Sequence, residues 1–202
     1  MWIKNVVVMV CLLFPAMAYG ISGNVSGTWD ISQSPVLVDG DITIQKGESL
    51  TINPGVTILF AGPFSITVKG ELVAQGNLNM PIVFTRAQAT DASRWKGLIF
   101  NGASDTSILE YCVIQYVYKS STNSQDMRGG AVAITDCSPT VRYNLIRNNE
   151  VYNQYRHGAG GGIYITGSST SLVEENELSN NEADSGGAIY VGHDARPTIH
   201  RN

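Results

Sequence analysis

The chain has 202 residues, of which 15% are charged, and a formal net charge of −4 at pH 7. Its few basic residues are scattered, which argues against nucleic acid as a partner, because affinity for that polyanion rests on clustered Lys and Arg. With 21 Gly and 7 Pro residues, the composition favours an elongated β-structure over a helical or disordered chain.

Residues 1–18 predict a signal peptide. Lys4 gives a short positive end, residues 6–14 form an apolar run, and Ala16 and Ala18 are small residues at the positions that a signal peptidase inspects. The run is shorter than the roughly 20 residues that span a bilayer, so a retained membrane anchor is the less favoured alternative. We therefore expect bacterial export, a secreted or cell-surface location, and no stable membrane span in the mature chain.

The first half of the mature chain alternates apolar residues with Thr in short bursts. Ile42-Thr43-Ile44 and Ile66-Thr67-Val68 are examples, and turn residues such as Asn53-Pro54-Gly55 bound them. This pattern predicts short strands joined by tight turns. Such strands suit a sandwich, a barrel or a β-helix equally well.

Two repeated segments in the second half favour a β-helix. A Gly-Gly segment recurs at 129–134, 160–165 and 186–191, and a second pattern follows it: an aliphatic residue, two free positions, Asn or Cys, one free position and an aliphatic residue. The second pattern places four residues at one bend: Cys112, Asn144, Asn176 and Asn202.

The spacing of this bend residue varies at one turn only. Asn144 and Asn176 are 32 residues apart, Asn176 and Asn202 are 26 apart, and the difference falls in residues 150–158. A repeat whose length changes at one turn is typical of stacked coils. We predict an all-β solenoid, a right-handed parallel β-helix, over residues 36–202, with residues 19–35 as an N-terminal lead-in or cap. Because Asn202 stops in mid-motif, we expect the domain to be truncated at its C-terminal end.

The bend carries a second prediction, an asparagine ladder. Asn tolerates left-handed backbone geometry, and its amide can bond the Asn stacked one coil away. The register also separates the two cysteines of the mature chain, because Cys137 precedes Asn144 by 7 residues whereas Cys112 occupies the Asn144 position. A disulfide is therefore not favoured, since a bridge requires close Cα atoms.

Strand alternation assigns the faces of the Gly-Gly segments. Val132 and Ile134, with their equivalents in the later copies, are expected inside, whereas Ala133, Tyr164 and Tyr190 are expected outside. Tyr164 and Tyr190 would then form an exposed aromatic pair that could stack on sugar rings or on a partner protein. The alternative is that Tyr simply suits a strand.

Several segments resemble known families. Residues 178–190 are similar to the repeat of chlamydial polymorphic outer-membrane proteins, with Leu178 where that repeat has Phe. Residues 47–58, 81–85 and 95–100 resemble coils of exported bacterial proteins of the pectin-lyase-like superfamily. The resemblance implies the β-helix fold and surface display. It also implies that enzymes of this kind would be lyases with Ca²⁺-binding Asp residues or hydrolases with an Asp cluster and a His.

The candidate catalytic and metal-binding residues do not form such clusters. Asp39 and Asp41, like Asp184 and Asp194, do not sit at matching coil positions, so we expect solvated turn residues rather than two convergent carboxylates. His157 with Gly158 resembles a His-Gly fragment of a hydrolase motif, but no Asp motif accompanies it. His193 and His200 lack the ligand spacing of a zinc site. We predict no catalytic residue, no metal and no cofactor in this chain.

These observations favour a non-catalytic function. We expect an exported or surface-displayed stalk that adheres to a polysaccharide or to a surface protein. The alternative is a polysaccharide lyase or glycoside hydrolase whose active face lies largely outside this chain, and Ca²⁺ would enter only with the lyase.

Overall fold

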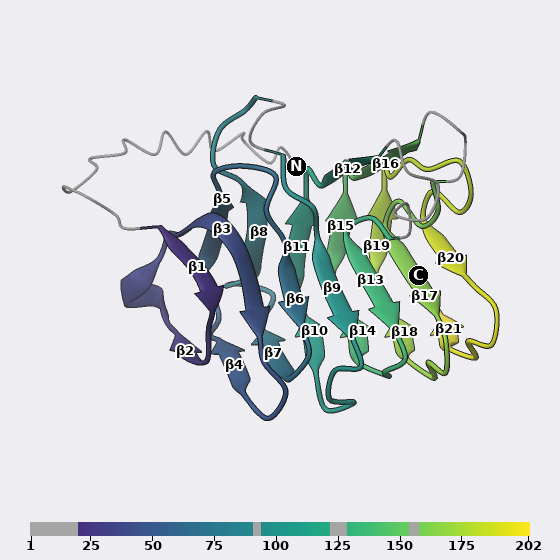
Figure 1. Cartoon of the computed structure of the whole chain (residues 1–202), viewed down its shortest axis with the longest axis horizontal. Coiled ribbons are helices and arrows are strands. Elements are labelled where there is room, and N and C mark those ends of the chain that lie inside the picture. Colours follow the sequence, from purple (N-terminus) through teal and green to yellow (C-terminus); the bar gives the residue numbers. More distant parts are fainter. Residues whose placement is uncertain (1–19, 91–93, 122–128, 154–157) are drawn as a thin grey trace, which may run out of the picture.

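The fold was analysed in a computed structural model, which describes residues 20–90, 94–121, 129–153 and 158–202. The predicted signal peptide lies outside these residues. The strands are short, pair in parallel and stack coil upon coil along the long axis of the molecule (Figure 1). The predicted parallel β-helix is confirmed.

Each coil contributes one strand to each of three faces, which the chain visits in the order A, B, C. Face A consists of β5 (Thr57–Phe60), β8 (Ile82–Arg86), β11 (Cys112–Gln115), β15 (Leu145–Arg147) and β19 (Glu177–Ser179). Face B consists of β6 (Ile66–Val68), β9 (Leu98–Asn101), β13 (Val132–Thr135), β17 (Ile163–Thr166) and β20 (Ile189–Val191). Face C consists of β2 (Gly27–Trp29), β4 (Ser49–Ile52), β7 (Glu71–Gln75), β10 (Ile108–Glu110), β14 (Thr140–Arg142), β18 (Leu172–Glu174) and β21 (Thr198–His200).

The N-terminal coil joins faces A and B through one long strand. β3 (Val36–Ile44) pairs with β5 through its first residues and with β6 through its last. β1 (Ile21–Asn24) pairs in parallel with β3, and a 3-10 turn, η1 (Ile31–Gln33), follows β2. The segment expected as a lead-in or cap therefore contributes strands to the sheets.

Asp39 and Asp41 lie within β3 and not in a turn, so the turn prediction is wrong for this pair. The strand bends from one face to the next without interruption because it has a different pairing partner at each end. Both side chains are exposed, as expected. The Asp41 carboxylate accepts hydrogen bonds from the N–H and the hydroxyl of Ser65, both at 2.9 Å.

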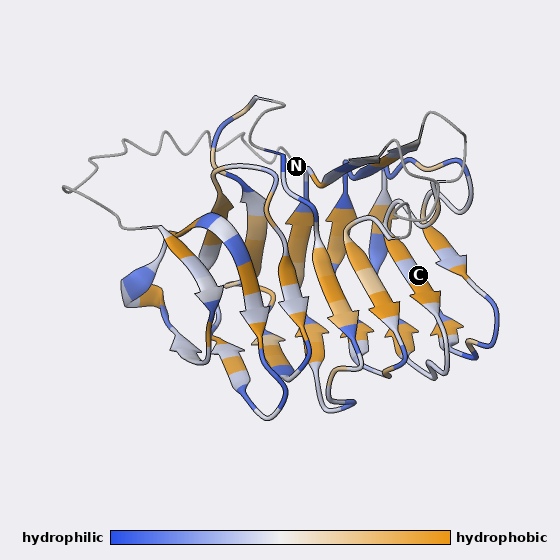
Figure 2. Cartoon of the chain, in the orientation of Figure 1, coloured by the Kyte–Doolittle hydropathy of each residue, from blue (hydrophilic) through white to orange (hydrophobic). Residues whose placement is uncertain are grey.

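The core is made of apolar stacks that follow the register of the coils. On face A, Phe84 stacks between Ile58 and Ile114. On face B, Val132 and Ile163 pair in register, as do Ile134 and Ile165, and all four are fully buried. Apolar residues concentrate on the strands and hydrophilic ones at the turns (Figure 2). The predicted inward stacks are thus confirmed for these two copies, whereas in the third copy Val191 pairs with Ile165 but is 41% exposed. Within the described residues, no helix is long and apolar enough to cross a membrane.

The predicted asparagine ladder is present at the corner between faces C and A. The Asn144 amide donates to Oδ1 of Asn176 at 2.9 Å, and the Asn176 amide donates to Oδ1 of Asn202 at 2.8 Å. The left-handed residue, however, is not the ladder Asn but the residue before it, with φ of 55° at Tyr143 and 53° at Glu175. At this bend, one residue therefore adopts the left-handed backbone conformation, and the next residue forms the ladder hydrogen bonds.

A second ladder lies at the corner between faces A and B, five residues after the first. The Asn149 amide donates to Oδ1 of Asn181 at 2.9 Å, and Oδ1 of Asn149 accepts the N–H of Val117 at 3.0 Å. Here too the preceding residues, Asn148 and Asn180, are left-handed.

Cys112 and Cys137 are free and buried, as the register led us to expect. Burial raises the pKa of the Cys112 thiol, and burial likewise raises the pKa of Cys137.

Candidate functional site

The predicted aromatic pair is stacked but not exposed. The rings of Tyr164 and Tyr190 lie 5.4 Å apart with 1° between their planes, which confirms the register. Tyr164, however, is only 4% exposed, and Tyr190 is partly buried. The prediction of an exposed pair is therefore wrong for Tyr164.

The Gly-Gly segments explain this burial. Gly160 has a φ of +71°, and a Cβ built on it would lie 2.7 Å from Cβ of Tyr164. Gly129 of the preceding coil has a φ of +90°, and its Cβ would lie 3.4 Å from the same atom. The glycines thus bring backbone against the outer side of face B, where alternation alone predicts open solvent.

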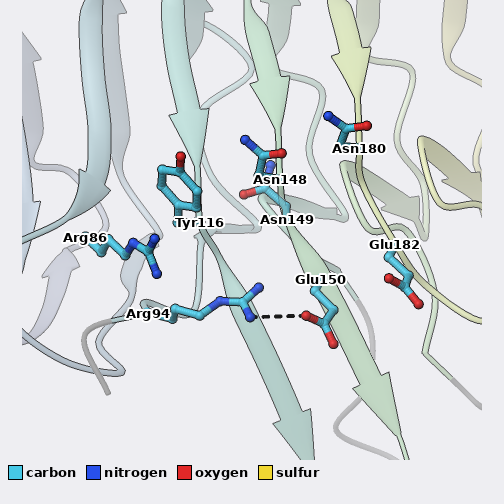
Figure 3. A pocket seen from close by; sticks show the side chains of 8 residues that line it. All are labelled: Arg86, Arg94, Tyr116, Asn148, Asn149, Glu150, Asn180 and Glu182. Carbon is cyan, nitrogen blue, oxygen red and sulfur yellow. Dashed lines mark hydrogen bonds and ion pairs between the residues drawn. The ribbon is translucent and has the colours of Figure 1, made fainter. Parts of the chain in front are cut away.

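A polar groove of about 360 Å³ lies at the corner where the chain passes from face A to face B, here called the AB corner (Figure 3). Its volume falls within the range of ligand pockets, roughly 300–1,000 Å³. The lining side chains come from four successive coils: Arg86, Arg94, Tyr116, Asn148, Asn149, Glu150, Asn180 and Glu182.

The coil register arranges these side chains in two columns. Tyr116, Asn148 and Asn180 form one column, because each is the left-handed residue that directly follows its face A strand. Glu150 and Glu182 belong to the other, since they form a parallel bridge. The column continues through β12 (Tyr118–Ser121), which pairs with β16 (Glu150–Asn153). Neighbouring members of a column are separated by one strand spacing, about 4.8 Å.

Arg94 is held in the groove by three contacts. Its Nη1 lies 3.1 Å from Oε2 of Glu150, its Nη2 donates to the carbonyl of Val117 at 3.2 Å, and its guanidinium lies 4.5 Å from the centre of the Tyr118 ring. Among the described residues, its buried Nε has no hydrogen-bond partner. These contacts fix the position of the guanidinium group in the lining of the groove.

Trp95 anchors the segment that carries Arg94. Its indole is fully buried and stacks on Phe60 with 4.1 Å between ring centres, and its Nε1–H donates to the carbonyl of Gln115 at 2.9 Å. Trp95 also forms a parallel bridge with Val117. Core packing, rather than the coil repeat, thus positions Arg94.

The two ends of the groove carry charges of opposite sign. Arg86 stacks over the Tyr116 ring at 4.2 Å, whereas Glu182 is exposed at the other end. In the part of the chain that the structure describes, neither takes part in an ion pair, and the Arg94–Glu150 contact is the ion pair within the groove. The lining is therefore balanced, with two guanidinium groups and two carboxylates.

The groove suits recognition of hydroxyl-rich ligands better than metal chemistry. Amides, guanidinium groups and carboxylates together offer donors and acceptors over four coils. Across the described ranges, no group of three or more His, Cys, Asp and Glu residues is placed to hold a metal ion. His193 contacts the adjacent Asp194, His200 contacts Glu174, and His157 lies outside the described residues.

None of the groove residues was predicted from the sequence. The Tyr116 column was accessible in principle, because Tyr116, Asn148 and Asn180 are spaced by 32 residues, as are the ladder residues beside them. The same comparison would have found the stacked pair Tyr111 and Tyr143, whose ring centres lie 5.1 Å apart at the corner between faces C and A. Arg94 has no equivalent in the repeat.

The comparisons with known proteins identify the fold and leave the function open. The family described as "Right handed beta helix region" matches residues 21–202, which also supports the predicted handedness. A segment of 50 residues, 25% of this chain, is 46% identical to Protein bark beetle of Drosophila melanogaster but spans only 2% of that protein. No solved structure matches the chain significantly. The likeness to exported bacterial proteins and to polymorphic outer-membrane repeats stays a prediction.

Proposed function

We propose that this chain, which belongs to the right-handed β-helix family, is an exported or surface-displayed, non-catalytic stalk that binds a polysaccharide at the AB corner. The observation that carries the proposal is the groove itself. Its polar side chains recur at the strand spacing over four coils, so that an extended polymer can lie along them.

The types of side chain support a carbohydrate ligand. Sugars present hydroxyl groups around a ring with weakly polar faces, and they are bound by planar polar groups together with aromatic rings. Asn148, Asn180 and Arg94 supply the first kind of group, and Tyr116 supplies the second. The fixed guanidinium of Arg94 adds preorganisation, which reduces the entropy lost on binding.

A matched pair of variants tests the site. Tyr116→Asn removes the ring but keeps a residue type that the same column already holds at left-handed φ in Asn148 and Asn180. Tyr143→Asn makes the same change at a φ of 55°, outside the groove. Binding would be measured by isothermal titration calorimetry against a panel of soluble neutral and acidic polysaccharides.

We expect Tyr116→Asn to weaken binding by about two- to ten-fold, the effect of one aromatic contact, and Tyr143→Asn to leave it unchanged. An equal loss in both variants would place the ligand elsewhere on the molecule. No binding to any polysaccharide of the panel would reject the proposed function.

A glycoside hydrolase is the second candidate, because Glu150 and Glu182 are bridge partners on adjacent coils. A spacing of one strand, about 4.8 Å, is near the roughly 5–5.5 Å between the carboxyl groups of retaining glycosidases. Release of reducing ends would be assayed with the same panel, and unsaturated products formed on addition of Ca²⁺ would indicate a lyase instead. Turnover that Glu182→Gln abolishes would establish the enzyme and reject the non-catalytic stalk.

A further inference from the structure

We infer that the polysaccharide bound at the AB corner is a neutral one, and that Glu182 is the residue that excludes acidic polymers. This inference rests on the proposed function and specifies its ligand class. It follows from the placement of charges along the groove.

The charges are balanced in sum but separated in space. Arg94 and Glu150 lie 3.1 Å apart and neutralise each other in the middle of the groove. Arg86 lies at the β8 end and Glu182 follows β19, three coil steps away. At about 4.8 Å for each step, these two charges are separated by roughly 14 Å along the axis.

This separation exceeds the distance over which exposed charges act on each other. The Debye length is about 8 Å at physiological ionic strength. An anionic sugar unit beside Glu182 therefore gains little from Arg86 and experiences mainly the repulsion of the carboxylate. A polymer with one acidic group on every unit is attracted at one end of the groove and repelled at the other. A neutral polymer is not repelled by Glu182, and it can form hydrogen bonds with the donors and acceptors along the whole groove.

The side chain of Glu182 is not needed for the fold. The backbone of this residue holds its place in the coil, since its N–H donates to the carbonyl of Asn149 at 2.8 Å and its carbonyl accepts the N–H of Val151 at 2.9 Å. The carboxylate is exposed and takes part in no ion pair among the described residues. Glu182→Gln therefore removes a charge and keeps both the shape and the backbone contacts.

Glu177 provides the matched control. It lies in β19 of the same coil, is also exposed, and faces outward on face A, away from the groove. Glu177→Gln changes the net charge of the chain by the same amount as Glu182→Gln.

The experiment compares the wild-type chain with these two variants. Calorimetry would measure binding to a neutral polymer from the panel and to its acidic derivative on the same backbone, for example hydroxyethyl cellulose and carboxymethyl cellulose. We expect the wild type to prefer the neutral polymer. Glu182→Gln should raise the affinity for the acidic polymer, relative to the affinity for the neutral polymer, by about two- to five-fold, the effect of one exposed charge.

Three results would overturn the inference. Tighter binding of the acidic polymer by the wild type would reject the neutral ligand and leave the groove as the binding site. An equal gain in Glu177→Gln would assign the effect to net charge rather than to Glu182. Failure of every polymer, neutral and acidic, would reject the proposed function together with the inference.

Discussion

The asparagine ladder at the corner between faces C and A should make a large contribution to stability, which Asn144→Ala tests. The Asn144 side chain is 2% exposed and makes three hydrogen bonds. Its Oδ1 accepts the N–H of Cys112 at 2.8 Å, and its Nδ2 donates to the carbonyl of Leu109 and to Oδ1 of Asn176, both at 2.9 Å. Alanine removes all three bonds and leaves their partners buried.

The magnitude follows from this count. A hydrogen bond contributes about 1 kcal/mol net, and each buried group left unsatisfied costs roughly 1–3 kcal/mol. We therefore expect Asn144→Ala to lower the free energy of unfolding by about 3–5 kcal/mol. That is a large part of the roughly 5–15 kcal/mol of a typical domain.

Urea unfolding of the wild-type chain and of Asn144→Ala measures this difference in the free energy of unfolding. Tryptophan fluorescence and far-ultraviolet circular dichroism should be recorded together, because a solenoid can unfold in parts and a single free energy requires coincident transitions. Asn101→Ala is the control, since Asn101 is an exposed residue at the end of β9. A loss below about 1 kcal/mol in Asn144→Ala, or an equal loss in the control, would contradict the role assigned to the ladder.

Three further outcomes are expected. Gly130→Ala should lower the free energy of unfolding by about 3 kcal/mol, because its Cβ would lie 1.9 Å from a carbonyl oxygen of the next coil. Gly47→Ala, at φ +86° in open space, should lower it by only about 1 kcal/mol. The urea midpoints of the two variants test this difference. Cys112 should resist iodoacetamide until the chain unfolds, because burial raises the pKa of its thiol, and peptide mapping checks this. Hydrogen bonds from two hydroxyl groups, first that of Thr106 and then that of Ser49, lower the pKa of Glu71 below its ordinary value of 4.5. The contribution of Glu71 to stability is therefore present above pH 4.5 and is lost as the pH falls through the lowered pKa, so Glu71→Gln should reduce the acid dependence of the urea midpoint.

The coil register was predictable because the interval of the sequence repeat determines which residues lie in neighbouring coils. Residues 32 apart, such as Asn144 and Asn176, are forced into neighbouring coils when the apolar pattern repeats at the same interval. The inward stack of Val132 on Ile163 follows from the same interval. The asparagine ladder and the core stacks can therefore be predicted from the repeat interval alone.

The groove needed information that the repeat does not contain. Arg94 reaches Glu150 because Trp95 packs on Phe60 inside the solenoid, and this contact joins segments with no common motif. The exposure of Tyr164 was mispredicted for a related reason. Alternation says which way a side chain points, but the left-handed Gly160 decides whether backbone lies against it.

The bends explain why polar and aromatic side chains gather at the AB corner of this solenoid. At each bend, one residue must satisfy buried backbone groups, and Asn149 does so at the AB corner: its Oδ1 accepts the N–H of Val117 and its Nδ2 donates to the carbonyl of Ile114. The residue before it must adopt left-handed geometry, and its side chain then projects away from the core. That position holds Tyr116 in one coil and Asn148 in the next, so it tolerates different side chains. The fold thus constrains one column of the corner and leaves the adjacent column free to vary, and a binding site can change there without loss of the ladder.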